Sequence, residues 1–125
     1  MERNKYHVLL NSSSLQYTDA PVELFSRLSS IAHSFFFIDR TQFLHPLDKH
    51  SEDRINVQSI SFPPNDEVAS FPVWGFSMSK WTGMYKKRHR IRHFWEAYTD
   101  GSYRLQGSPQ EVELKSYGFL LEKLP

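Results

Sequence analysis

The dipeptide Asp100-Gly101 is the local feature that most constrains how this chain folds. It separates two segments rich in strand-forming residues, 85–99 and 102–106. Both central residues of a type I′ turn need positive φ, which Asp-Gly tolerates, so this dipeptide predicts a two-residue β-hairpin. The hairpin would place Tyr98 opposite Tyr103 as a cross-strand aromatic pair. The sequence therefore predicts antiparallel strands in the second half of the chain.

The clearest helical pattern follows Asp19, which is a good N-cap residue. Pro21 suits the first turn of a helix and Glu23 complements its dipole. The apolar residues that follow fall on one helical stripe, namely Leu24, Phe25, Leu28, Ile31, Ala32 and Phe35. This pattern predicts an amphipathic helix over about residues 20–33 that packs on the core.

A second helix is predicted near the C-terminus. The tetrapeptide Ser-Pro-Gln-Glu at 108–111 is a capping box with proline at the first helical position. We expect the helix to stop near Tyr117, with Gly118 as its C-cap and a final strand at 119–124. The alternative is a helix that continues to the C-terminus.

Other segments rich in β-branched and aromatic residues predict strands. These segments are residues 6–10, 36–40, 55–62 and 71–78. Within 55–62 the apolar residues change face between Val57 and Ile60, which predicts a bulge near Ser59.

These elements predict a single domain, residues 1–125, of the α+β class. We expect a mostly antiparallel, curved sheet of five to six strands, packed by one long amphipathic N-terminal helix and a shorter C-terminal helix. The chain has no cysteine, which excludes disulfides and thiol chemistry and suits a cytoplasmic protein. Its longest apolar runs, 35–38 and 119–121, are far shorter than the ~20 residues that span a bilayer, so we expect no membrane partner.

Positive charge is concentrated in residues 80–92, although the net charge of the chain is only +1. Six basic residues and no acid lie there, namely Lys80, Lys86, Lys87, Arg88, Arg90 and Arg92. If residues 86–92 form a strand, their side chains alternate between two faces. One face would carry Lys86, Arg88, Arg90 and Arg92, and the other would carry Lys87, His89, Ile91, His93 and Trp95.

The cationic row suggests nucleic-acid binding as the first hypothesis. Same-face residues stand ~7 Å apart along a strand, which is close to the separation of successive phosphates. Trp81 and Tyr85 flank the row and would stack on unpaired bases. Lys80, Lys87 and Arg104 would assist. An acidic protein surface is an alternative partner for the row, and a solvated strand face without a partner is the simplest interpretation.

Two other functions stay open. In the first, the protein is a homo-oligomer, a dimer, whose interface is the face with His89, Ile91, His93 and Trp95. In the second, the protein binds a small molecule or is an enzyme, and its many aromatic residues, Trp74 among them, line a pocket in a cone-shaped fold.

Signatures of metal or cofactor chemistry are missing from the sequence. His89 and His93 on one strand would lie ~13 Å apart, too far to share a metal ion. The sequence contains no glycine-rich dinucleotide motif, Walker loop or nucleophile elbow. The sequence therefore favours a protein that is not an enzyme and that has no metal and no cofactor.

Overall fold

The computed structural model describes residues 6–45, 51–62, 64, 67–97, 103–104 and 113–125. The elements follow in the order β1 (Tyr6–Ser12), a short 3-10 helix η1 (Leu15–Tyr17), α1 (Pro21–Ser30), β2 (His33–Leu44), β3 (Arg54–Phe62), β4 (Glu67–Gly75), α2 (Met78–Arg88), β5 (His89–Glu96), β6 (Tyr103–Arg104) and β7 (Glu113–Lys123). The protein is therefore of the α+β class. Within these described ranges, no helix has the length and apolar character needed to cross a membrane.

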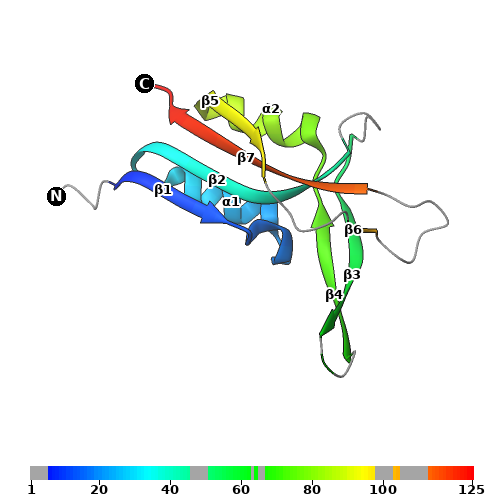
Figure 1. The fold of residues 1–125 in the computed structure, drawn as a ribbon. Coiled ribbons are helices and arrows are strands. Elements are labelled where there is room, and N and C mark those ends of the chain that lie inside the picture. Colours follow the sequence, from blue (N-terminus) through cyan, green and yellow to red (C-terminus); the bar gives the residue numbers. More distant parts are fainter. Residues whose placement is uncertain (1–5, 46–50, 63, 65–66, 98–102, 105–112) are drawn as a thin grey trace.

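Five strands form the main sheet. Its order is β1-β2-β7-β5, and β6 pairs with the start of β7. The first two strands are parallel, because α1 returns the chain to the end of the sheet where β1 began. The remaining pairs in this sheet are antiparallel. Figure 1 shows β1 as the outermost strand, with α1 behind β1 and β2 and with α2 behind β5 and β7.

Both helices pack on the same face of this sheet, which we call the inner face. Phe25 of α1 contacts the rings of Trp81 and Tyr85 from α2. Phe25 also stacks on Phe36 of β2, and Tyr85 packs against Phe119 of β7. All five side chains are at most 5% exposed. The aromatic residues of the two helices therefore fill the space above the sheet and form the core.

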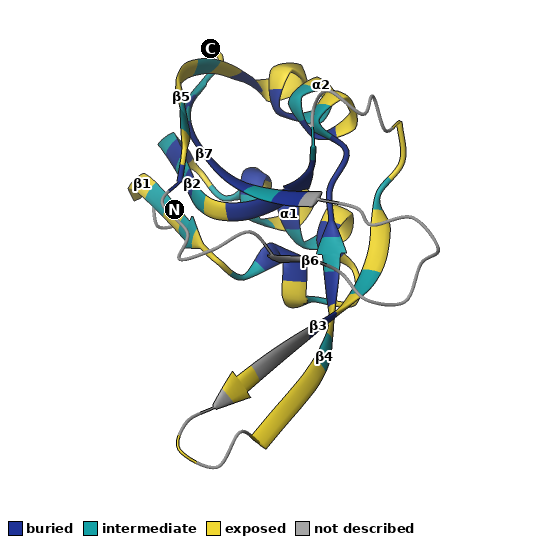
Figure 2. Ribbon diagram, turned by 45° about the vertical axis from the view of Figure 1, so that its right-hand side comes forward, coloured by how far each residue is buried: buried dark blue, intermediate teal, exposed yellow. Residues whose placement is uncertain are grey.

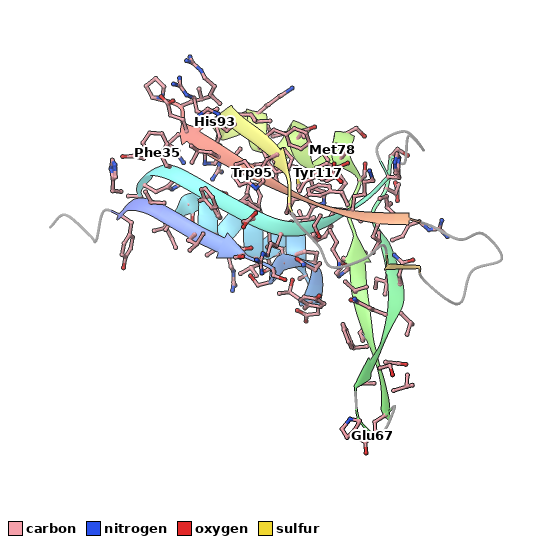
Figure 3. The ribbon with its side chains drawn as sticks, in the orientation of Figure 1. Phe35, Glu67, Met78, His93, Trp95 and Tyr117 are labelled. Carbon is pink, nitrogen blue, oxygen red and sulfur yellow. The ribbon has the colours of Figure 1, made fainter. Side chains whose placement is uncertain are left out.

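A separate two-stranded ribbon, β3 and β4, projects from the sheet, and Glu67 lies at its tip (Figures 2 and 3). Ile55, Val57 and Val68 are 60%, 49% and 66% exposed. The two strands pair from end to end without a register shift, so the bulge predicted near Ser59 is wrong. Ile55 and Val57 lie on the exposed face of the ribbon, and Gln58 and Val73 on its other face are buried, so the apolar spacing along β3 does not dictate the register.

The first helix is predicted correctly in type but not in length. α1 has ten residues, so the long N-terminal helix of the expected fold is wrong. It ends early because the hydroxyls of Ser29 and Ser30 donate to carbonyls of the preceding turn, which competes with helix continuation. The backbone is extended at Ile31, and β2 begins two residues later.

The predicted C-terminal helix is also wrong, because residues 113–123 form β7. Tyr117, Phe119 and Leu121 are buried at every second position, which is the period of a strand. Gly118, predicted to end a helix, lies in the middle of this strand. The capping box at 108–111 and the Asp100-Gly101 turn lie outside the described residues.

The predicted basic strand is wrong over residues 86–88, because Met78–Arg88 form α2, whereas residues 89–92 lie in β5. The side chain of Ser77 caps the helix by accepting a hydrogen bond from the Lys80 N–H. The Asp53 carboxylate accepts hydrogen bonds from the Ser77 N–H at 2.7 Å and from the Trp81 indole at 3.0 Å. Trp81 and Tyr85 are four residues apart and therefore project from the same side of the helix into the core.

Candidate functional site

The face of the main sheet opposite the helices, which we call the outer face, carries large apolar side chains. In the strand register, Val8 lies beside Phe35, and Leu10 lies beside Phe37 and, one strand further, Leu120. Val8 and Leu10 are 49% and 70% exposed, and the other three are half-buried. Because both described helices pack on the inner face, these side chains form an open apolar surface. Phe35 is labelled in Figure 3.

Trp95 lies flat across the outer face because its partner on β7, Gly118, has no side chain. A Cβ atom at Gly118 would lie 2.1 Å from Cε2 of the indole. The indole Nε1 donates to Oδ1 of Asp39 at 3.1 Å, and the indole ring lies 5.1 Å from the ring of Phe37. Phe37 and Trp95 therefore form a fixed aromatic pair that is half-buried on this face.

A bulge in β5 brings positive charge to the same face. The pairing of β5 with β7 shifts by one residue between Ile91 and His93, so Arg92 is an extra residue in β5. Simple alternation would put Arg90 and Trp95 on opposite faces of the strand. The bulge instead puts both of them, together with His93, on the outer face. His93 and Trp95 are labelled in Figure 3.

The cations near this bulge do not form the predicted row. Residues 86–88, all basic, form the last turn of α2, where they complement the helix dipole. Successive helical side chains diverge by ~100°, so these three cannot share a face with Arg90. All of them and Arg90 are exposed, and among the described residues they form no ion pair with an acid. Arg92 pairs with Glu122 at 3.4 Å.

Three of the other residues predicted for a site, Trp81, Tyr85 and His89, are buried in the core. Trp81 and Tyr85 are fully buried, so neither ring is open to stacking on a base. The predicted face of His89, Ile91, His93 and Trp95 is divided: His89 is 2% exposed and Ile91 packs against the core, whereas His93 and Trp95 lie on the outer face. Lys80 binds Asp53 at 3.0 Å beside the start of α2.

Phe35, Phe37 and Gly118 complete the outer face and are absent from the predicted site. Sequence periodicity assigned Phe35 to the stripe of the first helix, whereas it lies in β2. Phe35 and Phe37 are on the outer face, and Phe36 and Ile38 are fully buried. Because residues 35–38 are all apolar, the sequence does not show that their side chains alternate between the two faces of the sheet. The apolar run still indicates a strand, because it is typical of a strand with apolar side chains on both faces.

His33 and His89 form a buried pair on the inner side, with their Nε2 atoms 2.9 Å apart. Nδ1 of His33 donates to the carbonyl of Ile31, so Nε2 of His33 is the acceptor and Nε2–H of His89 is the donor. Burial, assisted by the nearby His33, Lys123 and Arg88, lowers the pKa of His89 from 6.5 to about 4. The buried position therefore favours the neutral form of His89.

Two cavities lie beside α1. The larger, of about 690 Å³, is bordered by Trp74 and by four charged residues, Glu23, Glu52, Asp53 and Lys80. The smaller, of about 260 Å³, lies against α1 and α2. Trp74 borders the larger cavity, whereas Phe76, Trp81 and Tyr85 fill the core. In the described part of the chain, no group of three His, Asp or Glu side chains is placed to hold a metal.

No protein-family model, no curated protein and no solved structure matches this chain. Relatives therefore supply no function for it. The outer face is the described surface where rigid aromatic rings and exposed cations lie together.

Proposed function

We propose that the protein binds single-stranded nucleic acid on the outer face of its main sheet. The observation that carries this proposal is the aromatic pair of Phe37 and Trp95, held over Gly118 next to Arg90. Bases stack on exposed aromatic rings whatever their sequence, and nearby cations contact the phosphates. The proposal keeps the nucleic-acid partner expected from the sequence. It assigns binding to a face of the main sheet instead of to one basic β-strand. We place the protein in the cytoplasm.

The aromatic rings suit stacking because their positions are fixed before a ligand arrives. Trp95 is held by its contact with Gly118 and by its hydrogen bond to Asp39. A fixed ring loses little rotamer entropy on binding. Phe35 and Phe37 are neighbours on one face of β2, which spaces them ~7 Å apart. That spacing suits successive bases of an extended strand.

The cations supply contacts for the backbone that carries those bases. Arg90 is exposed and unpaired with acids among the described residues, and the exposed cations of residues 86–88 lie just before it, in the last turn of α2. The side chains of Arg92 and Glu122 are 48% and 36% exposed. An ion pair this exposed contributes only about 0–1 kcal/mol, so a phosphate can replace Glu122 as the partner of Arg92.

A single strand is favoured over a duplex because the bases of a duplex already stack on one another and cannot stack on the sheet. The projecting ribbon does not provide a groove-binding arm. Beyond Arg54 at the start of β3, neither strand of the ribbon contains a basic residue. Arms that enter a DNA groove depend on cations to approach the phosphates.

Fluorescence anisotropy with labelled oligo-dT, oligo-U and a duplex of equal length, measured across a salt series, tests the proposal. The single strands should bind more tightly than the duplex. Arg90→Ala should flatten the salt dependence by about 0.7 in logarithmic slope, as for one lost phosphate contact. Phe37→Leu should weaken binding about tenfold, since stacking one base contributes about 1–3 kcal/mol.

Two matched controls make the test specific. Phe37→Tyr keeps an aromatic ring and should bind like the unmodified protein. Arg27→Ala removes an exposed cation from α1, where it pairs only with Glu23, and should not alter binding. Equal affinities for Phe37→Leu and Phe37→Tyr, equal losses for Arg27→Ala and Arg90→Ala, or a preference for the duplex would each overturn the proposal.

A further inference from the structure

β1 leaves one edge of the main sheet unpaired in the described part of the chain (Figure 1). Proteins usually protect such edges with charges, prolines or bulges. β5, at the opposite edge, has Arg90, Arg92 and a bulge. Tyr6–Ser12 has no Lys, Arg, Asp, Glu or Pro, and its pairing with β2 has no register shift. This edge is therefore open to pairing with another strand.

The hydrogen-bonding groups on this edge can be assigned. The Tyr6 N–H donates to the carbonyl of Ala32 at 2.9 Å, which is on the β2 side. Alternate residues of a parallel strand bond to the same neighbour, so the backbone groups of residues 6, 8 and 10 point toward β2. Those of His7, Leu9 and Asn11 point toward the free edge.

The side chains of β1 change from apolar to polar in the same order in both directions from Leu9. Moving outward from Leu9, the strand has Val8 then His7 on one side, and Leu10 then Asn11 on the other. An antiparallel copy of this strand centred on Leu9 therefore sets Val8 opposite Leu10 and His7 opposite Asn11. Apolar side chains meet apolar ones, and polar side chains meet polar ones.

We propose that two copies of the chain pair through antiparallel β1 strands about a two-fold axis at Leu9. In this register the free backbone groups of His7, Leu9 and Asn11 all meet their counterparts in the second copy. Val8 and Leu10, 49% and 70% exposed in one copy, cover each other across the axis. The strand that pairs with β1 is β1 of a second copy, because β1 carries no Lys, Arg, Asp or Glu and its pattern of polar and apolar side chains is complementary to itself.

The two main sheets then form one continuous sheet with both outer faces on the same side. The aromatic surfaces of two chains become one extended surface. Pairing through β1 does not depend on nucleic acid, and the experiments below contain none. A failure of this inference is therefore distinct from a failure of the proposed function.

Cysteine cross-linking tests the register, because the chain has no cysteine of its own. Val8→Cys and Leu10→Cys both replace exposed side chains, so neither should unfold the protein. Cα atoms of a non-hydrogen-bonded antiparallel pair lie about 4.5 Å apart, within the range of a disulfide. Mild oxidation of an equal mixture of the two variants should give the disulfide between Cys at position 8 of one copy and Cys at position 10 of the other in clear excess over random pairing. This disulfide should also form faster than the disulfide-linked dimer of either variant alone. A random distribution of disulfides would overturn the register.

Sedimentation velocity across a concentration series tests the dimer itself. Unmodified protein should shift from monomer to dimer as concentration rises, and Leu10→Lys should stay monomeric. Combining Leu10→Lys with Val8→Glu should restore the dimer, because opposite charges would then face each other across the axis. Ile55→Lys, at an equally exposed apolar position on the ribbon, should still dimerise. A monomer at all concentrations, or a dimer abolished by Ile55→Lys but not by Leu10→Lys, would overturn the inference.

Discussion

Mild acid should destabilise this protein through its buried histidine pair. His89 is 2% exposed and donates through Nε2–H to His33, so a second proton on His89 would go to Nδ1, which is buried and has no hydrogen-bond partner among the described residues. The positive charges of Lys123 and Arg88 also disfavour a charged ring at this position. The folded protein therefore keeps His89 neutral at pH values where the unfolded chain protonates it.

The size of the effect follows from the pKa of His89, which falls from 6.5 to about 4 on folding. Above pH 6.5 neither state binds the proton, and the folded state keeps its full stability. Between pH 6.5 and 4 the unfolded chain binds a proton that the folded chain does not, so the free energy of unfolding falls as the pH falls. A shift of about 2.5 pKa units corresponds to about 3 kcal/mol at pH 4.

Urea unfolding followed by tryptophan fluorescence, at pH steps from 7 to 4, measures this loss. His89→Gln keeps an N–H donor for His33 but does not titrate, so its stability should fall by about 3 kcal/mol less over this range. His93→Gln replaces an exposed histidine on the same strand and should follow the unmodified protein. The reasoning is refuted if the unmodified protein and His89→Gln lose stability in parallel.

Three further substitutions should change stability in predictable directions, each measured by urea unfolding at pH 7. Gly118→Ala should displace the Trp95 indole, cost about 1–3 kcal/mol and weaken oligonucleotide binding; an unchanged tryptophan spectrum would contradict this. Asp53→Ala should cost about 3 kcal/mol, because the Trp81 indole and the start of α2 lose a buried acceptor. Tyr85→Phe should stabilise the protein by about 1 kcal/mol, because the buried hydroxyl has no hydrogen-bond partner among the described residues; a loss of stability would count against this.

The elements predicted correctly are those with strong local signals. The strand at 6–10 corresponds to β1, the strand at 55–62 corresponds to β3, and Pro21 and the apolar stripe after it locate α1. The end of α1 was missed because Ser29 and Ser30 act through side-chain hydrogen bonds that apolar periodicity does not register. Phe35 continues the helical stripe by spacing alone, although it lies in a strand.

α2 was missed because its stability depends on distant residues. Its charged side chains and Gly83 make a poor helical pattern, and its buried face consists of two aromatic residues, Trp81 and Tyr85. The start of the helix is held by Asp53, which lies 24 residues before Ser77 in the sequence. A local sequence pattern cannot show a contact between residues that lie 24 positions apart. The local pattern therefore predicts a strand for the basic residues at 86–88.

The same irregular spacing of apolar residues occurs in two strands and has opposite outcomes. Ile91 and Phe94 are three residues apart, yet both pack toward the inner face, where Phe94 stacks on Tyr117. In β5 the buried inner face determines the register, so the spacing forces the bulge at Arg92. In the ribbon, Ile55 and Val57 are 60% and 49% exposed, whereas Gln58 and Val73 on the opposite face are buried, so burial of these apolar residues does not determine the register and the pairing stays regular. A change of apolar phase therefore predicts a bulge only where the apolar residues on both sides of it contact the core, and here that bulge is what joins the cations to the aromatic surface.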